Sequence, residues 1–210
     1  MKLDLALRLV EAGAIIAFAL SGFLEAARKR MDVVGVIAVA FITAFGGGTL
    51  RDILLDRRPL FWVEHQEYVL LIFVVSLAAM ALMRGRHQRL TERAIQVPDA
   101  LGLGLFSVSG TSLALEAQLP LFVASLMGVI TAVFGGVMRD IICNEVPTVF
   151  RDHRPYALCS FAGCWVFLAL HLAQAPPLLG LAAGAAAAAG LRLLALARGW
   201  TLPAGRGGEG

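Results

Sequence analysis

Seven apolar stretches recur along the chain, and they restrict its fold more than any other feature of the sequence. Most of them approach the roughly 20 residues that a helix needs to cross the hydrocarbon core of a bilayer. They occupy residues 12–24, 33–50, 69–83, 100–115, 119–138, 156–173 and 178–191. Of the 210 residues, 59% are hydrophobic and the mean hydropathy is +0.78, which is typical of a multi-span membrane protein. We therefore predict an all-α integral membrane protein with seven transmembrane helices.

The sequence contains no pattern that predicts catalysis or a bound cofactor. Its three cysteines lack CxxC spacing, and its four histidines lack the spacing of metal ligands. The segment GLGLF at 102–106 does not follow a strand, as a dinucleotide-binding motif would. The net charge of +3 comes with basic residues that cluster in loops, so it informs topology rather than nucleic-acid binding. We expect no enzyme activity, no cofactor and no nucleic-acid partner.

Two similar segments reveal an internal repeat. AFGGGTLRDILLDRRP at 44–59 and AVFGGVMRDIICNEVP at 132–147 place Arg51 and Arg139 88 residues apart. A shift of 88 aligns residues 11–82 with 99–170 without a gap. The identical pairs include Phe18/Phe106, Ser21/Ser109, Gly22/Gly110, Thr43/Thr131, Asp52/Asp140, Pro59/Pro147, His65/His153 and Tyr68/Tyr156. Shared apolar composition does not explain matching charges, prolines and histidines, so we predict a sequence duplication.

The duplication defines the organisation of the chain. We predict one membrane domain over residues 1–198, with repeats at about 5–87 and 93–174, a seventh helix at about 178–198 and a flexible tail at 199–210. Each repeat contains three spans, and three is odd, so the second copy enters the membrane from the opposite side. Gly180 and Gly184 form a GxxxG pattern, which favours a packing role for the seventh helix over an alanine-rich span chosen for insertion alone.

Basic residues in the loops predict the orientation. The connections after the fourth and sixth spans contain no lysine or arginine. Those after the first and third spans contain Arg28, Lys29, Arg30, Arg84, Arg86, Arg89 and Arg93, whereas the connection after the second span mixes Arg57 and Arg58 with several acids. The positive-inside rule then places the N-terminus outside and the C-terminus in the cytoplasm.

The glycine-Arg-Asp motif allows two interpretations. In the first, the glycines permit helix packing and the charged pair lies at the headgroups, where a helix leaves the lipid. In the second, the glycines break the helices at a transport path, because breaks in corresponding spans of both halves mark such paths. Exposed carbonyls and nearby hydroxyls could then replace the hydration shell of a cation. We favour the second interpretation because the motif is duplicated.

Adjacent residues on a helix do not face each other, so Arg51 and Asp52 each need another partner if they are buried. We hypothesise that the repeats exchange partners, with Arg51 bound to Asp140 and Arg139 bound to Asp52. For Glu11, a position facing a pore is the alternative, and an end position of the first span is favoured.

The paired FGGG-x-x-RD and FGG-x-x-RD motifs, each followed by a proline on three plus three plus one spans, resemble the prokaryotic trimeric intracellular cation (TRIC) channel family. Some bacterial relatives of that family are described as glycine transporters. The resemblance covers about residues 5–198. It implies a homotrimer with one pore in each protomer, spans 2 and 5 kinked at the glycines, and potassium as the permeant ion.

Carried over to this sequence, the resemblance and the duplicated motif give a set of candidate permeation residues. They are Ser21, Thr43, Gly46, Gly47, Gly48, Arg51, Asp52, Ser109, Thr131, Gly135, Gly136, Arg139 and Asp140. The candidate potassium contacts among them are Thr43, Gly46, Thr131 and Gly135. Phe134 replaces the first glycine of the triplet in the second half, so the two kinks are not expected to be equivalent.

These observations lead to a potassium-permeable channel in a bacterial inner membrane, in contact with lipid on its outside. The alternative is a secondary transporter of glycine or a similar small zwitterion. In that case Arg and Asp would bind the carboxylate and the amine, and the inverted repeat would support alternating access.

Overall fold

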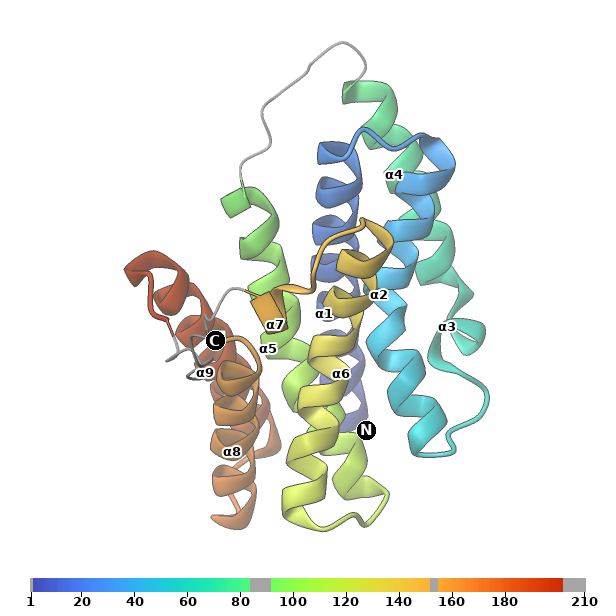
Figure 1. The fold of residues 1–210 in the computed structure, drawn as a ribbon. Helices are drawn as coiled ribbons and strands as arrows, with labels where there is room; N and C mark the ends of the chain where they lie inside the picture. Colours follow the sequence, from blue (N-terminus) through green and yellow to red (C-terminus); the bar gives the residue numbers. More distant parts are fainter. Residues whose placement is uncertain (1, 84–91, 152–154, 202–210) are drawn as a thin grey trace, which may run out of the picture.

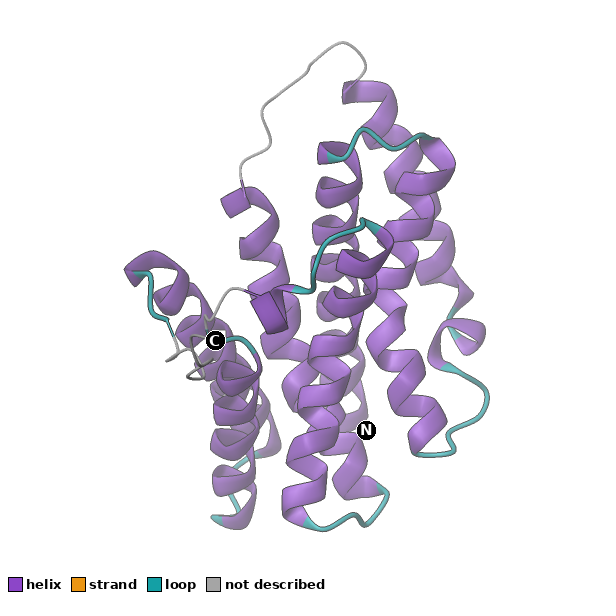
Figure 2. Cartoon of the chain, in the orientation of Figure 1, coloured by secondary structure: helices purple, strands orange, loops and turns teal. Residues whose placement is uncertain are grey.

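The computed structural model describes residues 2–83, 92–151 and 155–201, and within these ranges every regular element is a helix (Figures 1 and 2). The elements are α1 (Lys2–Arg28), α2 (Val33–Leu54), α3 (Phe61–Glu64), α4 (Gln66–Met83), α5 (Glu92–Glu116), α6 (Leu121–Ile142), α7 (Thr148–Arg151), α8 (Ala157–Leu172) and α9 (Pro177–Arg198). Arg84, Arg86 and Arg89, and tail residues 202–210, lie outside the described residues.

The long helices coincide with the seven apolar stretches, and the chain is an all-helical membrane protein. Among the described residues, four helices are long and apolar enough to cross a bilayer: Leu5–Arg28, Val33–Leu54, Leu121–Ile142 and Pro177–Arg198. The apolar parts of α4 and α8 are shorter. Helix α5 is long but less apolar, because it begins at Glu92 and includes Pro98 and Asp99 in its first two turns.

The two halves of the described chain have opposite directions. Figure 1 shows α1 and α5 side by side and antiparallel, and likewise α2 and α6. A shift of 88 residues superimposes the bounds of α2 on those of α6. The residues with left-handed backbone also correspond, Arg30 with Gln118 and Asp56 with Asn144. The duplication seen in the sequence is therefore a structural repeat with inverted direction.

Helices α2 and α6 cross each other at their glycines. A β-carbon on Gly47 would overlap the carbonyl oxygen of Thr131, and one on Gly135 would overlap the carbonyl oxygen of Thr43. Both helices are continuous through the glycines, so the predicted break in the helices is wrong for this structure. The physical reason is that α-helical glycine keeps its hydrogen bonds here, and the missing side chain allows two backbones to approach.

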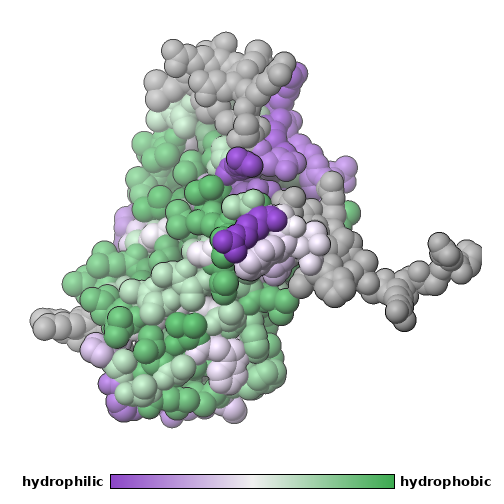
Figure 3. All heavy atoms as spheres, turned by 90° about the vertical axis from the view of Figure 1, so that its left-hand side faces the viewer, coloured by the Kyte–Doolittle hydropathy of each residue, from purple (hydrophilic) through white to green (hydrophobic). Residues whose placement is uncertain are grey.

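The seventh long helix, α9, packs on the second half of the molecule. Each of Gly163 and Gly184 lies against the other's carbonyl oxygen, at a distance that leaves no room for a β-carbon on either residue. Gly104 of α5 lies equally close to the carbonyl of Ala185. The predicted packing role of α9 is confirmed by these contacts. Figure 3 shows the broad hydrophobic surface of the molecule on the side where α8 and α9 lie in Figure 1.

Candidate functional site

Arg51 and Asp52 lie in the last turn of α2, and both are buried in protein. Arg51 is 1% exposed and Asp52 is 2% exposed, so neither side chain reaches the surface. Because a buried charge is costly without partners, the surrounding groups must satisfy both residues. The interpretation of the pair as a surface anchor at the headgroups is therefore wrong for this structure.

Arg51 is the centre of a cluster of acids and a serine. Its Nη1 lies 2.5 Å from Glu11 Oε1, while Nε and Nη2 donate to Asp52 Oδ1 at 2.9 and 2.8 Å. Ser109 lies 3.4 Å from Nη1 and donates to Glu11 at 3.1 Å. The second oxygen of Asp52 accepts from the backbone N–H of Phe61 at 3.0 Å. The first cluster thus joins α1, α2, α3 and α5.

Arg139 is the centre of the equivalent cluster in the second half. Its Nη1 lies 2.5 Å from Asp99 Oδ1 and donates to Ser21 at 2.6 Å. Its Nε and Nη2 lie 2.9 and 2.8 Å from Asp140 Oδ1. Thr148 donates its backbone N–H and its hydroxyl to the second oxygen of Asp140, at 2.8 and 2.9 Å. Tyr156 donates to Asp99 Oδ2 at 2.8 Å.

The predicted exchange of Arg and Asp between repeats is wrong. Each arginine instead binds the aspartate that follows it and the acid in the first helix of its own half. The β-carbons of adjacent residues diverge on a helix, but the long stem of arginine lets its guanidinium return to the neighbouring carboxylate. The side chain that each half contributes to the arginine of the other half is a serine: Ser109 contacts Arg51, and Ser21 contacts Arg139.

Sequence reasoning missed the two acids that complete the clusters. Glu11 was expected at a helix end, and Asp99 was not among the candidate site residues. Both carboxylates are more than 90% buried, and they occupy the same position of the repeat. An acid retained at the same position in both copies, beside apolar stretches, is the signal that could have identified them.

Each cluster carries an excess of negative charge. Two carboxylates surround one guanidinium in both halves, giving a formal charge of −1 when all groups are ionised. The arginine in each cluster is therefore compatible with a cation nearby, because the negative charge of the two acids exceeds its positive charge. The backbone and serine donors around the carboxylates leave that formal charge unchanged.

The predicted threonines and glycines meet beside these clusters at the crossing of α2 and α6. Thr43 and Thr131 are fully buried, and their hydroxyls donate to Val39 and Met127 of their own helices at 2.6 and 2.7 Å. Gly48 and Gly136 are next to the guanidinium groups of Arg51 and Arg139; a β-carbon on either glycine would lie within 4 Å of the Nη2 atom. Gly46 faces Gly135 across the crossing. The crossing thus lies next to both arginine clusters.

The two clusters differ in their access to solvent. The Arg139 cluster faces a cavity of about 430 Å³. Its lining is mostly charged or polar and includes Glu25, Arg28, Lys29, Glu92, Gln96, Asp99, Arg139, Asp140, Glu145 and Arg192. The Arg51 cluster faces a space of about 10 Å³ beneath Phe61, Trp62 and Phe106, which holds no more than about one water. In the part of the chain that the structure describes, the site is therefore open at the Arg139 cluster and closed at the Arg51 cluster.

The chain is similar to known membrane proteins. The family model described as "Glycine transporter" matches twice, over residues 8–84 and 96–172. A UPF0126 membrane protein of Vibrio cholerae is 38% identical over 164 residues, covering 78% of this chain and 68% of its own length. The UPF0126 inner membrane protein YadS of Escherichia coli K12 is 38% identical over 146 residues, covering 70% of each chain.

Solved structures of similar fold are described as TRIC channels. The TRIC orthologue from Rhodobacter sphaeroides is 36% identical with a TM-score of 0.85, covering 92% of this chain and 98% of its own. A second structure, described in connection with conductance through TRIC cation channels, is 32% identical with a TM-score of 0.83 and covers 97% and 98%. The chain therefore belongs to the glycine transporter family of membrane proteins, and it is a bacterial relative of the TRIC channels.

Proposed function

We propose that the protein is a potassium-permeable cation channel with one conduction path in each protomer of a homotrimer. The observation that carries the proposal is the pair of buried clusters with a formal charge of −1, one of which faces the charged cavity. A negative path wall favours cations. The similarity to proteins described as trimeric intracellular cation channels supports both the channel and the trimer.

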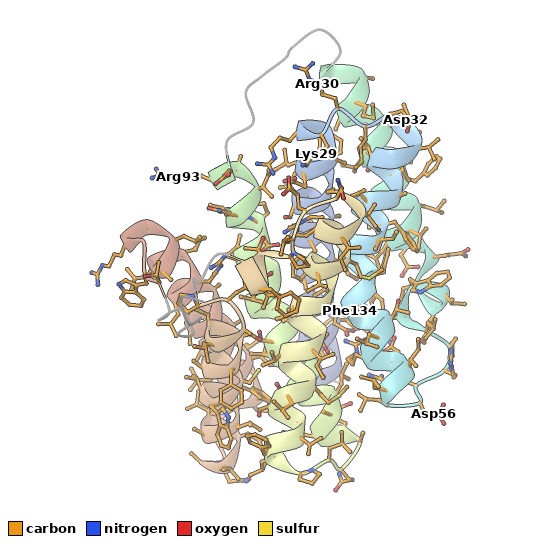
Figure 4. All side chains as sticks on the ribbon, in the orientation of Figure 1. Lys29, Arg30, Asp32, Asp56, Arg93 and Phe134 are labelled. Atoms are coloured by element: carbon orange, nitrogen blue, oxygen red, sulfur yellow. The ribbon has the colours of Figure 1, made fainter. Side chains whose placement is uncertain are left out.

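In this proposal the seven long helices all cross a bacterial inner membrane, with the N-terminus outside and the C-terminus in the cytoplasm. Figure 4 shows Lys29, Arg30 and Arg93 near one end of the helices, together with Asp32, and Asp56 at the other end. The positive-inside rule counts only the basic residues and favours the cytoplasm for the first of these ends. The large cavity is then cytoplasmic. The YadS relative is described as an inner membrane protein, which supports the same location.

Permeation through the helix crossing requires a rearrangement from the present structure. Thr43 and Thr131 already donate to helix carbonyls, and no described cavity separates α2 from α6 at Gly47 and Gly135. We propose that bending at the glycines separates the helices in the conducting state. The carbonyls and hydroxyls at Thr43, Gly46, Thr131 and Gly135 then become potassium contacts.

Currents through single proteins test the function. We expect full-length protein in a planar bilayer under a potassium gradient to give discrete unitary currents that reverse near the potassium equilibrium potential. Electrically silent, saturable glycine counterflow without such currents would overturn the channel and establish a carrier. The family description as a glycine transporter and the unequal access of the two clusters favour this second candidate function.

Replacement of the aromatic cover over Arg51 is expected to increase the current. Trp62 lines the 10 Å³ space and packs edge-on against Phe41, with ring centroids 5.7 Å apart. Removing its ring by Trp62→Ala leaves only the crossing of α2 and α6 to open, so the path conducts for a larger share of the time and the time-averaged potassium current should rise severalfold. Trp165→Ala, on the partly exposed face of α8, is the matched control and should leave the current unchanged. An equal current in Trp62→Ala and the parent protein would show that the path closes elsewhere.

A further inference from the structure

Arg192 is a buried arginine without a carboxylate contact among the described residues. It lies on α9, is 1% exposed and belongs to the lining of the large cavity. Its Nε and Nη1 atoms donate to no acceptor in the part of the chain that the structure describes. The other basic residues of the lining are all in ion pairs, Arg28 with Glu25 at 2.7 Å, Lys29 with Glu145, and Arg139 with Asp99. Arg192 is therefore the basic residue of this lining that has no ion pair among the described residues.

A buried guanidinium with unused donors is costly, and the structure holds this one in place by stacking. The guanidinium carbon of Arg192 lies 4.7 Å from the ring centroid of Tyr156. The hydroxyl of the same ring donates to Asp99 at 2.8 Å. Tyr156 thus contacts the guanidinium of Arg192 with its ring and a carboxylate of the Arg139 cluster with its hydroxyl. Since the cost of burying unused donors falls when a ligand supplies acceptors, Arg192 is suited to bind an anionic group.

We propose that Arg192 binds the carboxylate of a small organic solute that enters the cavity. The planar guanidinium matches a carboxylate with two parallel hydrogen bonds. The cavity volume of about 430 Å³ accommodates a small solute. This site lies in the cavity at the open end of the proposed potassium path, but the binding of the solute is a separate property that does not depend on conduction.

The rest of the lining restricts the chemistry of that solute. Its carboxylates outnumber its basic residues, and they are Glu25, Glu92, Asp99, Asp140 and Glu145. A doubly charged phosphate near Arg192 would be repelled by this set, and a long acyl chain would find few apolar walls. A cationic group on the solute would instead be attracted. The lining therefore favours a small zwitterion, with its carboxylate at Arg192 and its ammonium toward Asp99.

Ligand-dependent thermal stability of the purified full-length protein tests the site. Ligand that binds only the folded protein raises its unfolding temperature in a saturable way. The probes are glycine, which has both charges, acetate, which lacks the ammonium, methylammonium, which lacks the carboxylate, and inorganic phosphate. For the parent protein we expect saturation by glycine at a lower concentration than by acetate. Methylammonium and phosphate should give weaker binding than acetate.

Variants of Arg192 connect that binding to the residue. Arg192→Gln should weaken glycine binding at least tenfold, and Arg192→Lys should keep part of it, because charge remains but the planar pair of donors is lost. Arg198→Gln on the same helix is the matched control, since Arg198 is exposed and lies outside the cavity lining. Arg192→Gln should fold, because it removes a group that has no hydrogen-bond acceptor at two of its nitrogens.

Three results would overturn the site. The first is the absence of saturable stabilisation by both glycine and acetate, and the second is equal binding in Arg192→Gln and Arg198→Gln. The third is tighter binding of inorganic phosphate than of acetate, which would assign Arg192 to phosphate, free or in a lipid headgroup. Potassium currents measured on the same Arg192→Gln protein separate this proposal from the channel, because currents should persist when glycine binding is lost.

Discussion

Replacement of Arg51 by methionine is expected to lower the free energy of unfolding by about 3–5 kcal/mol, the usual cost of removing one partner from a buried ion pair. The change leaves Glu11 and Asp52 without the guanidinium that now lies 2.5 and 2.8 Å from them. Those carboxylates cannot reach bulk solvent, because both are more than 90% buried. Denaturant titration of the purified protein, followed by its helical signal, measures the loss.

The control for this prediction is Arg57→Met, six residues further along the chain, beyond the end of α2 and exposed to solvent. It should change the unfolding free energy by no more than about 0.5 kcal/mol. A loss of equal size in Arg51→Met and Arg57→Met would contradict the buried cluster.

Double-variant cycles identify the partner of Arg51. Arg51→Met combined with Glu11→Gln should cost less than the sum of the single changes, by about 1 kcal/mol or more, because the second change removes a charge that the first leaves unpaired. Arg51→Met combined with Asp140→Asn should be additive within about 0.5 kcal/mol, since the two residues belong to different clusters. If only Arg51→Met and Asp140→Asn were non-additive, Arg51 would have the aspartate of the other repeat as its partner, as the exchange hypothesis predicts.

Helix positions could be predicted from the sequence because burial in lipid imposes a strong requirement. Every apolar stretch must satisfy its own backbone hydrogen bonds, so each becomes a helix. The duplicated motif then related α2 to α6, whose bounds correspond after the shift of 88 residues. The start of α5 was harder to predict, because Glu92, Gln96 and Asp99 interrupt the apolar pattern although they belong to the helix.

The partners of the charged residues could not be predicted, because they depend on side-chain reach rather than on helix periodicity. The rule that adjacent residues face apart holds for β-carbons, and the guanidinium of Arg51 nevertheless returns to Asp52. The unequal access of the two clusters to solvent could not be predicted from the sequence either. The repeats match at Ser21 and Ser109, and the difference arises from what covers each site, aromatic side chains at one end and a charged cavity at the other.

Replacement of Gly47 by alanine is expected to damage the protein more than any other change in the glycine triplet. The new methyl group would overlap the backbone carbonyl of Thr131, and a backbone cannot yield as a flexible side chain can. Helices α2 and α6 must separate, at a cost of at least about 1–3 kcal/mol in unfolding free energy. Gly135→Ala should have the same effect, because its methyl group would meet the carbonyl of Thr43.

Alanine substitutions at the neighbouring glycines distinguish two roles of the triplet, close packing of the helices and flexibility of α2. A β-carbon on Gly46 or Gly48 would come no nearer than 3.7 or 3.9 Å to other groups, which is ordinary contact. Alanine is favoured over glycine inside a helix by about 1 kcal/mol, so Gly48→Ala should be neutral or stabilising if packing alone matters. If bending at the triplet opens the path, Gly48→Ala should keep its stability yet reduce the potassium current, because a stiffer helix bends less readily. Equal loss of stability in Gly46→Ala, Gly47→Ala and Gly48→Ala would contradict the close crossing, whereas a loss confined to Gly47→Ala would support it.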